Sequence, residues 1–104
     1  MDVTIADDPA ASRWQATLGG GEVAGYAAYE LADAVLTMTH TVVDPAHEGE
    51  GIGGALVRAA LDDARDRGLA VLPRCAYVRA WLGRHDDYLD LVPEGRRAEY
   101  GLRS

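Results

Sequence analysis

Four glycines fall within six residues at the start of a helix-forming stretch, and this spacing is the most chemically informative feature of the chain. They are Gly49, Gly51, Gly53 and Gly54, and the residues Ala55–Val57 follow them. Because glycine has no Cβ, a large anion can approach the main chain closely at such positions. The free N–H groups and the positive dipole of a helix N-terminus attract that anion. The stretch therefore predicts a phosphate-binding loop.

Two known phosphate-binding fingerprints do not fit this loop. A P-loop requires a lysine, and the chain contains none. Dinucleotide-binding spacing is present as Gly49, Gly51 and Gly54, but that fingerprint follows its strand almost directly. Here five residues, one of them a proline, separate Val43 from Gly49. The expected acidic residue after the next strand is also replaced by Pro73-Arg74-Cys75. A dinucleotide-binding fold is therefore disfavoured.

The segments that precede the loop predict an antiparallel meander. Apolar and β-branched runs bounded by turn residues indicate four strands, which are Val3–Ile5, Arg13–Leu18, Val23–Leu31 and Ala34–Val43. Gly19–Gly21 and Ala32-Asp33 supply tight turns between the last three strands. Short turns of this kind join antiparallel neighbours.

After the meander the hydrophobic period changes to that of a helix. Apolar residues recur on one face from Gly53 to Ala64, and Gly68 is placed to end the helix at its C′ position. The short, wholly apolar segment Leu69–Leu72 that follows is typical of a buried strand. A strand–helix–strand crossover predicts that Leu69–Leu72 lies parallel to Ala34–Val43.

The elements together predict one α/β (α+β) domain over residues 1–104. Its sheet is mixed and mostly antiparallel, with a central βαβ crossover and flanking helices. Ala76–Leu82 predicts a second helix, and Asp87–Leu91 a further turn. The polar, arginine-rich tail of residues 93–104 is expected to be loose. A chain of 104 residues can bury a single core but not two.

Composition narrows the class of protein further. The formal net charge of −7 argues against a nucleic-acid partner, because phosphate backbones require a basic face. No apolar run approaches the roughly 20 residues of a membrane span, and the N-terminus lacks the features of a signal peptide. One cysteine and three histidines show no metal-ligand spacing, so no metal is expected. A lone cysteine fits a reducing compartment, so we expect a cytoplasmic protein. Because no apolar run is long enough to span a membrane, we expect no membrane partner.

The loop and its flanking residues resemble motif A of the GNAT superfamily of acyl-CoA-dependent N-acetyltransferases. The matching residues are Val43, Pro45, Gly49, Gly51, Ile52, Gly53 and Leu56. The similarity extends over roughly Val23 to Val92, because the family has the same meander, loop, helix and following strand in the same order. A short single-domain branch of the superfamily is further resembled by Pro73, Cys75, Tyr77, Tyr88, Asp90, Leu91 and Val92.

This resemblance implies that the chain binds acetyl-CoA. In the family, loop amides hold the CoA diphosphate, and the corresponding positions here are Glu48, Gly49, Glu50, Gly51, Ile52, Gly53 and Gly54. The strand end, Thr41, Val42 and Val43, is expected to pair with the pantetheine arm, with an N–H near Val42 or Val43 polarising the thioester carbonyl. This requires the strands Ala34–Val43 and Leu69–Leu72 to diverge at their C-terminal ends, where Cys75 meets the acyl group.

One residue of the loop departs from the family pattern. Glu48 stands where Arg or Gln is usual, and Glu50 lies nearby. Two carboxylates beside a diphosphate oppose its binding by like charge. Because main-chain amides supply most of the attraction, we expect weakened rather than abolished binding of CoA. Arg58, Arg79 and Arg84 are the candidates to offset the acidic charge.

Acetyl transfer to an amine requires a base for the amine and an acid for the departing thiolate. The resemblance implies that Tyr77 is the acid, although the same residue can be a packed aromatic. His40, three residues before Val43, is the candidate base, or a half-buried, hydrogen-bonded histidine. Cys75 is a candidate covalent nucleophile or a small buried apolar residue.

The function implied is acetyl-CoA-dependent transfer of an acetyl group to an amine of a small molecule or protein, by a monomer or homodimer. The alternative is a non-catalytic acyl-CoA-binding or sensor module, because the chain lacks the helical segment that shapes the acceptor site in longer family members. A third possibility is a structural domain in which the glycines only form a tight turn. The acidic balance favours a cationic acceptor.

Overall fold

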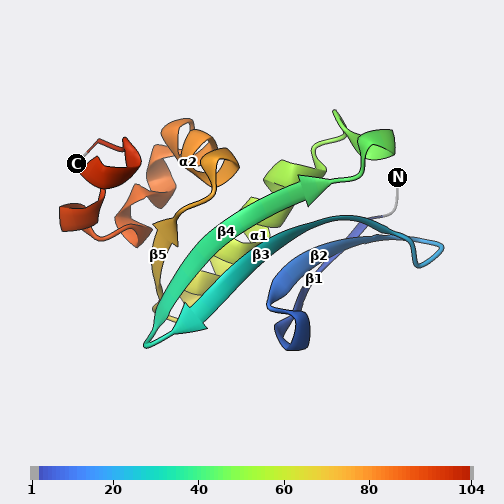
Figure 1. Ribbon diagram of the computed structural model, residues 1–104, viewed down its shortest axis with the longest axis horizontal. Coiled ribbons are helices and arrows are strands. Elements are labelled where there is room, and N and C mark those ends of the chain that lie inside the picture. The colour runs from blue at the N-terminus through green and yellow to red at the C-terminus, as the bar shows by residue number, and fades with distance from the viewer. Residues whose placement is uncertain (1–2, 104) are drawn as a thin grey trace.

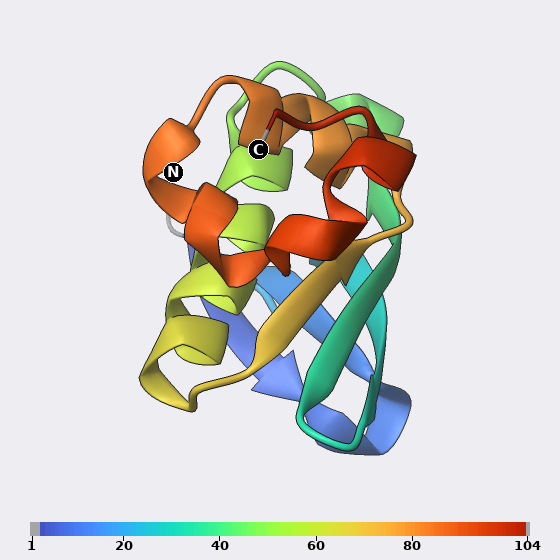
Figure 2. The ribbon, with the colours of Figure 1, turned by 90° about the vertical axis from the view of Figure 1, so that its left-hand side faces the viewer.

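The computed structural model describes residues 3–103, and these form a five-stranded sheet covered by a long helix (Figures 1 and 2). The strands are β1 (Val3–Asp8), β2 (Arg13–Leu18), β3 (Val23–Ala32), β4 (Val35–Val43) and β5 (Ala70–Pro73). They lie in the order β1-β2-β3-β4-β5, with β1 to β4 antiparallel and β5 parallel to β4. The predicted fold class is thus confirmed. The outermost residues of the predicted domain, Met1, Asp2 and Ser104, lie outside the described residues.

Helix α1 (Ile52–Asp66) supplies most of the core between the helix layer and the sheet. It contacts all five strands and crosses one face of the sheet (Figure 2). Its apolar stripe is fully buried and consists of Leu56, Val57, Ala60, Leu61 and Ala64. Burial of a leucine or valine side chain stabilises a fold by about 1.5–3 kcal/mol. Gly68 follows the helix with a φ of +69°, as predicted for a C′ glycine.

Several strand boundaries differ from the expectations, and β5 runs over Ala70–Pro73 rather than Leu69–Leu72. The turn between β3 and β4 is Asp33-Ala34 rather than Ala32-Asp33, and both of its residues have positive φ, 53° and 63°. Positive φ at both central residues is the geometry of a type I′ hairpin turn, which matches the twist of the flanking strands. Strand β1 continues to Asp8 rather than ending at Ile5, because β2 pairs with it along its whole length.

Strand β4 carries a bulge near its middle. Met38 pairs with Tyr29 of β3, but His40 pairs with Ala28, so Thr39 is the extra residue. Strand β5 pairs with β4 only from Val35 to Met38. Beyond that point β4 remains paired with β3 but not with β5, which leads into the second helix (Figure 1). The divergence that the family resemblance required is therefore present.

The segment after β5 is more ordered than expected. Helix α2 (Ala76–Gly83) and the 3₁₀ turn Asp86–Leu91 follow, and the tail predicted to be loose forms two more 3₁₀ turns, Glu94–Arg96 and Ala98–Tyr100. The correction has a physical cause, because Leu102 packs against the core and the Arg97 side chain donates to the Val92 carbonyl oxygen at 2.9 Å.

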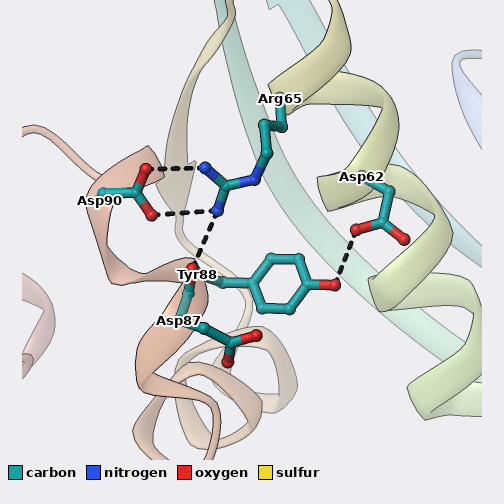
Figure 3. A network of polar contacts seen from close by, with 5 residues as sticks. All are labelled: Asp62, Arg65, Asp87, Tyr88 and Asp90. Carbon is teal, nitrogen blue, oxygen red and sulfur yellow. Dashed lines mark hydrogen bonds and ion pairs between the residues drawn. The ribbon is translucent and has the colours of Figure 1, made fainter.

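A polar network joins this C-terminal part to α1 (Figure 3). Arg65 of α1 donates to both carboxylate oxygens of Asp90, at 2.8 and 3.0 Å, and to the Asp87 carbonyl oxygen at 2.9 Å. Tyr88 donates its hydroxyl to Asp62 at 2.7 Å. The bond to Asp62, with burial, raises the pKa of Tyr88. These contacts hold the 3₁₀ turn Asp86–Leu91, which follows α2, against α1.

Candidate active site

A pocket of about 440 Å³ opens between the end of β4, the glycine-rich loop and the start of α2. The residues that line it are Thr41, Val43, His47, Glu48, Gly49, Gly51, Ile52, Gly53 and Tyr77. Seven of these nine residues, all except His47 and Tyr77, are among those predicted to bind the cofactor. Tyr77 was predicted for catalysis, whereas His47 was not predicted to have a role. The fold thus brings the loop and the strand end to one cavity.

Local geometry explains why the loop stays open toward this pocket. Gly49 and Gly51 have φ values of +83° and +81°, which side-chain-bearing residues rarely adopt. A Cβ built on either glycine would meet no atom within 4 Å, so the main chain there borders free space. Gly51 is the N-cap of α1 and brings no capping side chain, so the first amides of the helix have no side-chain cap from that residue.

The two remaining glycines have different surroundings. A Cβ on Gly53 would lie 2.7 Å from the Oη of Tyr77, so the phenol ring rests directly on this glycine. A Cβ on Gly54 would lie 3.6 Å from the Nε1 of Trp81, an ordinary contact distance. Gly53 is therefore required by the position of Tyr77, whereas Gly54 is not required by any contact of this kind.

The free edge of β4 borders the same pocket. The Asp44 amide donates to the Ala24 carbonyl oxygen of β3 at 2.8 Å. Because hydrogen-bonding direction alternates along an antiparallel strand, Val42 also directs its backbone groups toward β3, and Val43 and Thr41 direct theirs toward the free edge. Of the two predicted oxyanion donors, Val43 has the suitable orientation. The Val42 side chain, 44% exposed, borders a different depression on the opposite face of the sheet.

Cys75 lies behind the pocket wall rather than on it. Its side chain is 7% exposed, and its Sγ is 3.5 Å from the Oγ1 of Thr41. The Cys75 amide donates to the Met38 carbonyl oxygen at 2.9 Å, which anchors the start of α2 where β4 and β5 part. Thr41 borders the pocket and contacts Cys75, so it links the cysteine to the cavity that Tyr77 also lines.

His40 is not brought together with Cys75 and Tyr77. The bulge at Thr39 reverses the alternation of side chains along β4, so Thr41 and Val43 point to the pocket side. His40 falls on the opposite face of the sheet, where it is exposed. The expectation that His40 acts as base or acceptor guide at this pocket is therefore not supported by its position.

Charge at the loop differs from the expectation as well. The Nδ1 of His47 lies 3.2 Å from a Glu50 carboxylate oxygen, and its Nε2 lies 3.7 Å from a Glu22 carboxylate oxygen. The hydrogen bond to Glu50 is the main cause that raises the pKa of His47, and Glu22 and Asp44 add to the effect. Glu50 is thus paired with a histidine, and Glu48 is the acidic side chain that borders the pocket.

The three arginines expected to offset this acidity lie elsewhere. Arg58 donates to the Tyr88 hydroxyl at 3.1 Å and stacks over the ring of Trp81. Arg79 donates to the carbonyl oxygens of Pro73, at the end of β5, and of Arg74. Arg84 is exposed and is absent from the pocket lining.

The sequence did not predict a role for His47, because its contact with Glu22 joins segments that are far apart in the sequence.

The start of α1, which has no capping side chain, and the strand edge of β4 that has parted from β5 border the same pocket. The model of the GCN5-related N-acetyl-transferase family matches residues 13–91. The chain belongs to this family, as the resemblance of its loop predicted.

Individual relatives agree with this assignment. Streptothricin acetyltransferase from Streptomyces lavendulae is 46% identical over 50 residues, which are 46% of this chain and 26% of the relative. The chain thus spans about a quarter of the length of that curated relative. The solved ribosomal-protein-S18-alanine N-acetyltransferase from Escherichia coli is 28% identical, with a TM-score of 0.53 over 57% of this chain and 38% of the other.

A third similarity extends over nearly the whole chain. A GCN5-like protein from Staphylococcus aureus, solved by NMR, has a TM-score of 0.65 and covers 88% of this chain and 87% of its own. At 19% identity this match concerns the fold. It shows that a similar fold extends over most of a chain of similar length.

Proposed function

We propose that this chain binds acetyl-CoA and transfers its acetyl group to an amine. The observation that carries the proposal is the single pocket that joins the glycine-rich loop to the free edge of β4. Such a pocket offers main-chain donors for a diphosphate at one end and a strand edge for an amide-containing arm at the other. Membership of the N-acetyltransferase family supports this assignment.

The loop fits the diphosphate of CoA. Free space in front of Gly49 and Gly51 allows a phosphate to approach the backbone, which side chains at these positions would hinder. The N-terminal dipole of the 15-residue helix α1 favours negative charge there. Glu48 acts against this attraction, so we expect modest affinity.

The edge of β4 fits the pantetheine arm. Thr41 and Val43 direct backbone donors and acceptors toward the free edge, where an extended chain with amide groups can pair as an added strand. Acetyl-CoA, when bound, supplies the acetyl group as a thioester. The Val43 N–H is the donor that we assign to the thioester carbonyl oxygen, because a fixed main-chain donor stabilises negative charge that develops there.

Two side chains are assigned to the chemistry. Tyr77 lines the pocket and is 41% exposed, so its hydroxyl is available to protonate a departing thiolate. Cys75 lies behind the pocket wall in contact with Thr41, and we assign it as the nucleophile of a covalent route. Direct attack by the amine is the main route that we propose, and acetylation of Cys75 is the secondary route.

A non-catalytic acyl-CoA-binding module is the second candidate. It is favoured by the burial of Cys75 and by the position of His40 on the opposite face, because both reduce the set of groups that can handle protons at the pocket. The chain also spans a minor part of the curated relative that it matches. The proposal also includes an amine as the acceptor, a monomeric or homodimeric state, and a location in the reducing cytoplasm.

Calorimetric titration with CoA, followed by an assay for free thiol released from acetyl-CoA with a panel of amines, tests both candidates. We expect binding, a rise in Tm because CoA stabilises the folded state, and amine-dependent thiol release. Binding without thiol release for any amine supports the non-catalytic module. No binding at millimolar CoA contradicts both.

A further inference from the structure

His47 lies at the mouth of the proposed CoA pocket between carboxylates from two distant parts of the chain. Glu50 belongs to the glycine-rich loop, and Glu22 belongs to the connection between β2 and β3. The His47 side chain is 16% exposed and borders the pocket. It therefore touches the loop, the hairpin and the space assigned to the ligand.

A short turn fixes the histidine in this place. The Asp44 carboxylate accepts from the Ala46 amide at 2.9 Å, and the Asp44 carbonyl oxygen accepts from the His47 amide at 2.8 Å. Pro45 occupies the first position of the 3₁₀ turn Pro45–His47 and presets its backbone. The position of the imidazole is thus built by local contacts and does not depend on a bound ligand.

The charge at the loop depends on the protonation of this one side chain. The ionisable groups around it are Glu50, Glu22, Asp44 and the neighbouring Glu48, and all four are acidic. With neutral His47, a diphosphate at the loop meets uncompensated carboxylates. With protonated His47, both ring nitrogens are donors, and the positive charge offsets Glu50 and Glu22.

We infer that the protonation state of His47 controls how tightly the loop binds an anion. A diphosphate ligand binds more tightly when the His47 imidazole is protonated. This inference rests on the proposed function, because it assigns the loop to the diphosphate of CoA. The sign follows from the charges: protonation adds a positive charge beside an anion, and loss of the proton as the pH rises removes it. A raised pKa of His47, caused first by Glu50, brings this change closer to neutral pH.

Dephospho-CoA is the suitable probe for the test. The 3′-phosphate of CoA has a second pKa near 6 like other phosphate monoesters, and its titration would overlap that of His47. Dephospho-CoA lacks that group, and its diphosphate keeps a constant charge from about pH 5.5 to about pH 8.5. Its Kd is measured by calorimetry across this range for the wild type and for two substitutions of His47.

Each protein has a distinct expected profile. The wild type binds roughly threefold to tenfold more tightly at the acidic end, as expected for one added charge near the ligand with screening. His47→Gln binds weakly with no dependence on pH in this range, and His47→Arg binds tightly with none. Glu50→Gln, a matched removal of the partner charge, keeps the dependence with its midpoint moved to lower pH. Circular dichroism confirms that each variant is folded.

Two results would overturn the inference while leaving the proposed function standing. One is a wild-type Kd that does not change with pH, and the other is an unchanged pH profile in His47→Gln. A complete lack of binding by wild type and His47→Arg at every pH contradicts the proposed function itself. The two failures are therefore distinguishable.

Discussion

The ring of Tyr77 lies on the backbone of Gly53, so close that a Cβ at Gly53 would be 2.7 Å from the tyrosine Oη and 2.9 Å from Cζ. One residue comes from the first turn of α1 and the other from the first turn of α2. This contact sets the hydroxyl of Tyr77 beside the loop assigned to the diphosphate. The absence of a side chain at residue 53 therefore positions a side chain assigned to catalysis.

Gly53→Ala should reduce acetyl transfer with little loss of stability. The added methyl displaces the end of the Tyr77 side chain, which can swing outward because it is 41% exposed. Alanine also gains up to about 1 kcal/mol over glycine within a helix. Gly54→Ala is the matched control, since its Cβ makes only an ordinary contact with Trp81, 3.6 Å away. The free energy of unfolding in urea should be unchanged in both variants. An equal loss of acetyl transfer in Gly53→Ala and Gly54→Ala would then contradict the role assigned to the contact between Tyr77 and Gly53.

Thr41→Val should impair any chemistry that passes through Cys75. The Thr41 hydroxyl lies 3.5 Å from the Cys75 sulfur, and valine keeps the shape of the side chain but removes that hydroxyl. Mass spectrometry after treatment with acetyl-CoA should show less acetyl on Cys75 in Thr41→Val than in wild type, and Thr41→Ser should restore it. Full turnover in Cys75→Ala, with no acetyl-cysteine in wild type, would exclude the covalent route and leave direct attack.

Gly25→Ala should destabilise the fold by about 1–3 kcal/mol, as other insertions of bulk into packed sites do. A Cβ at Gly25 would lie 2.8 Å from the Val42 carbonyl oxygen and 3.3 Å from the Val43 Cα, and both atoms belong to the backbone of β4. Urea unfolding measures the change. Gly20→Ala serves as control, because a Cβ there meets no atom within 4 Å. A similar free energy of unfolding for the two variants would contradict the close approach of β3 and β4.

Tyr29 should make folding stability sensitive to alkaline pH. Burial, together with its hydrogen bond to Asp7 at 2.7 Å, raises the pKa of Tyr29 from 10.0 to about 12. A group whose pKa is raised by folding stabilises the native state below its unfolded pKa and loses that contribution as the pH rises through the folded value. The free energy of unfolding should therefore fall between about pH 10 and about pH 12, and less steeply in Tyr29→Phe. Identical slopes in both proteins would refute this origin.

Much of the fold was predictable because its signals are local. The alternating strands, the glycine turn before β3, the apolar stripe of α1 and Gly68 at its end each depend on a few neighbouring residues. The parallel placement of β5 follows from the handedness of a βαβ crossover. The glycine-rich loop was predictable for the same reason, because the glycines themselves indicate an open backbone.

The bulge in β4 was not predictable from these signals. Residues Thr37 to Val43 all suit a strand, and nothing in their order marks Thr39 as the residue without a partner. An unbroken alternation would place His40 on the same side as Met38. The pairing of His47 with Glu22 and the packing of Leu102 were hidden for a related reason, because each depends on contacts across the fold.

The bulge at Thr39 also separates two kinds of constraint on the side chains of a single strand. Up to Met38, inward side chains fill the interior, so exchanges there are limited by volume. From Thr41 onward, the inward side chains border the proposed ligand, so exchanges there can alter which acyl group is accepted while the interior stays intact. Because Met38 already pairs with Tyr29 and His40 with Ala28, deletion of Thr39 would straighten the strand and leave Thr41 and Val43 on the pocket side, whereas a residue inserted after Thr39 would turn them to the opposite face.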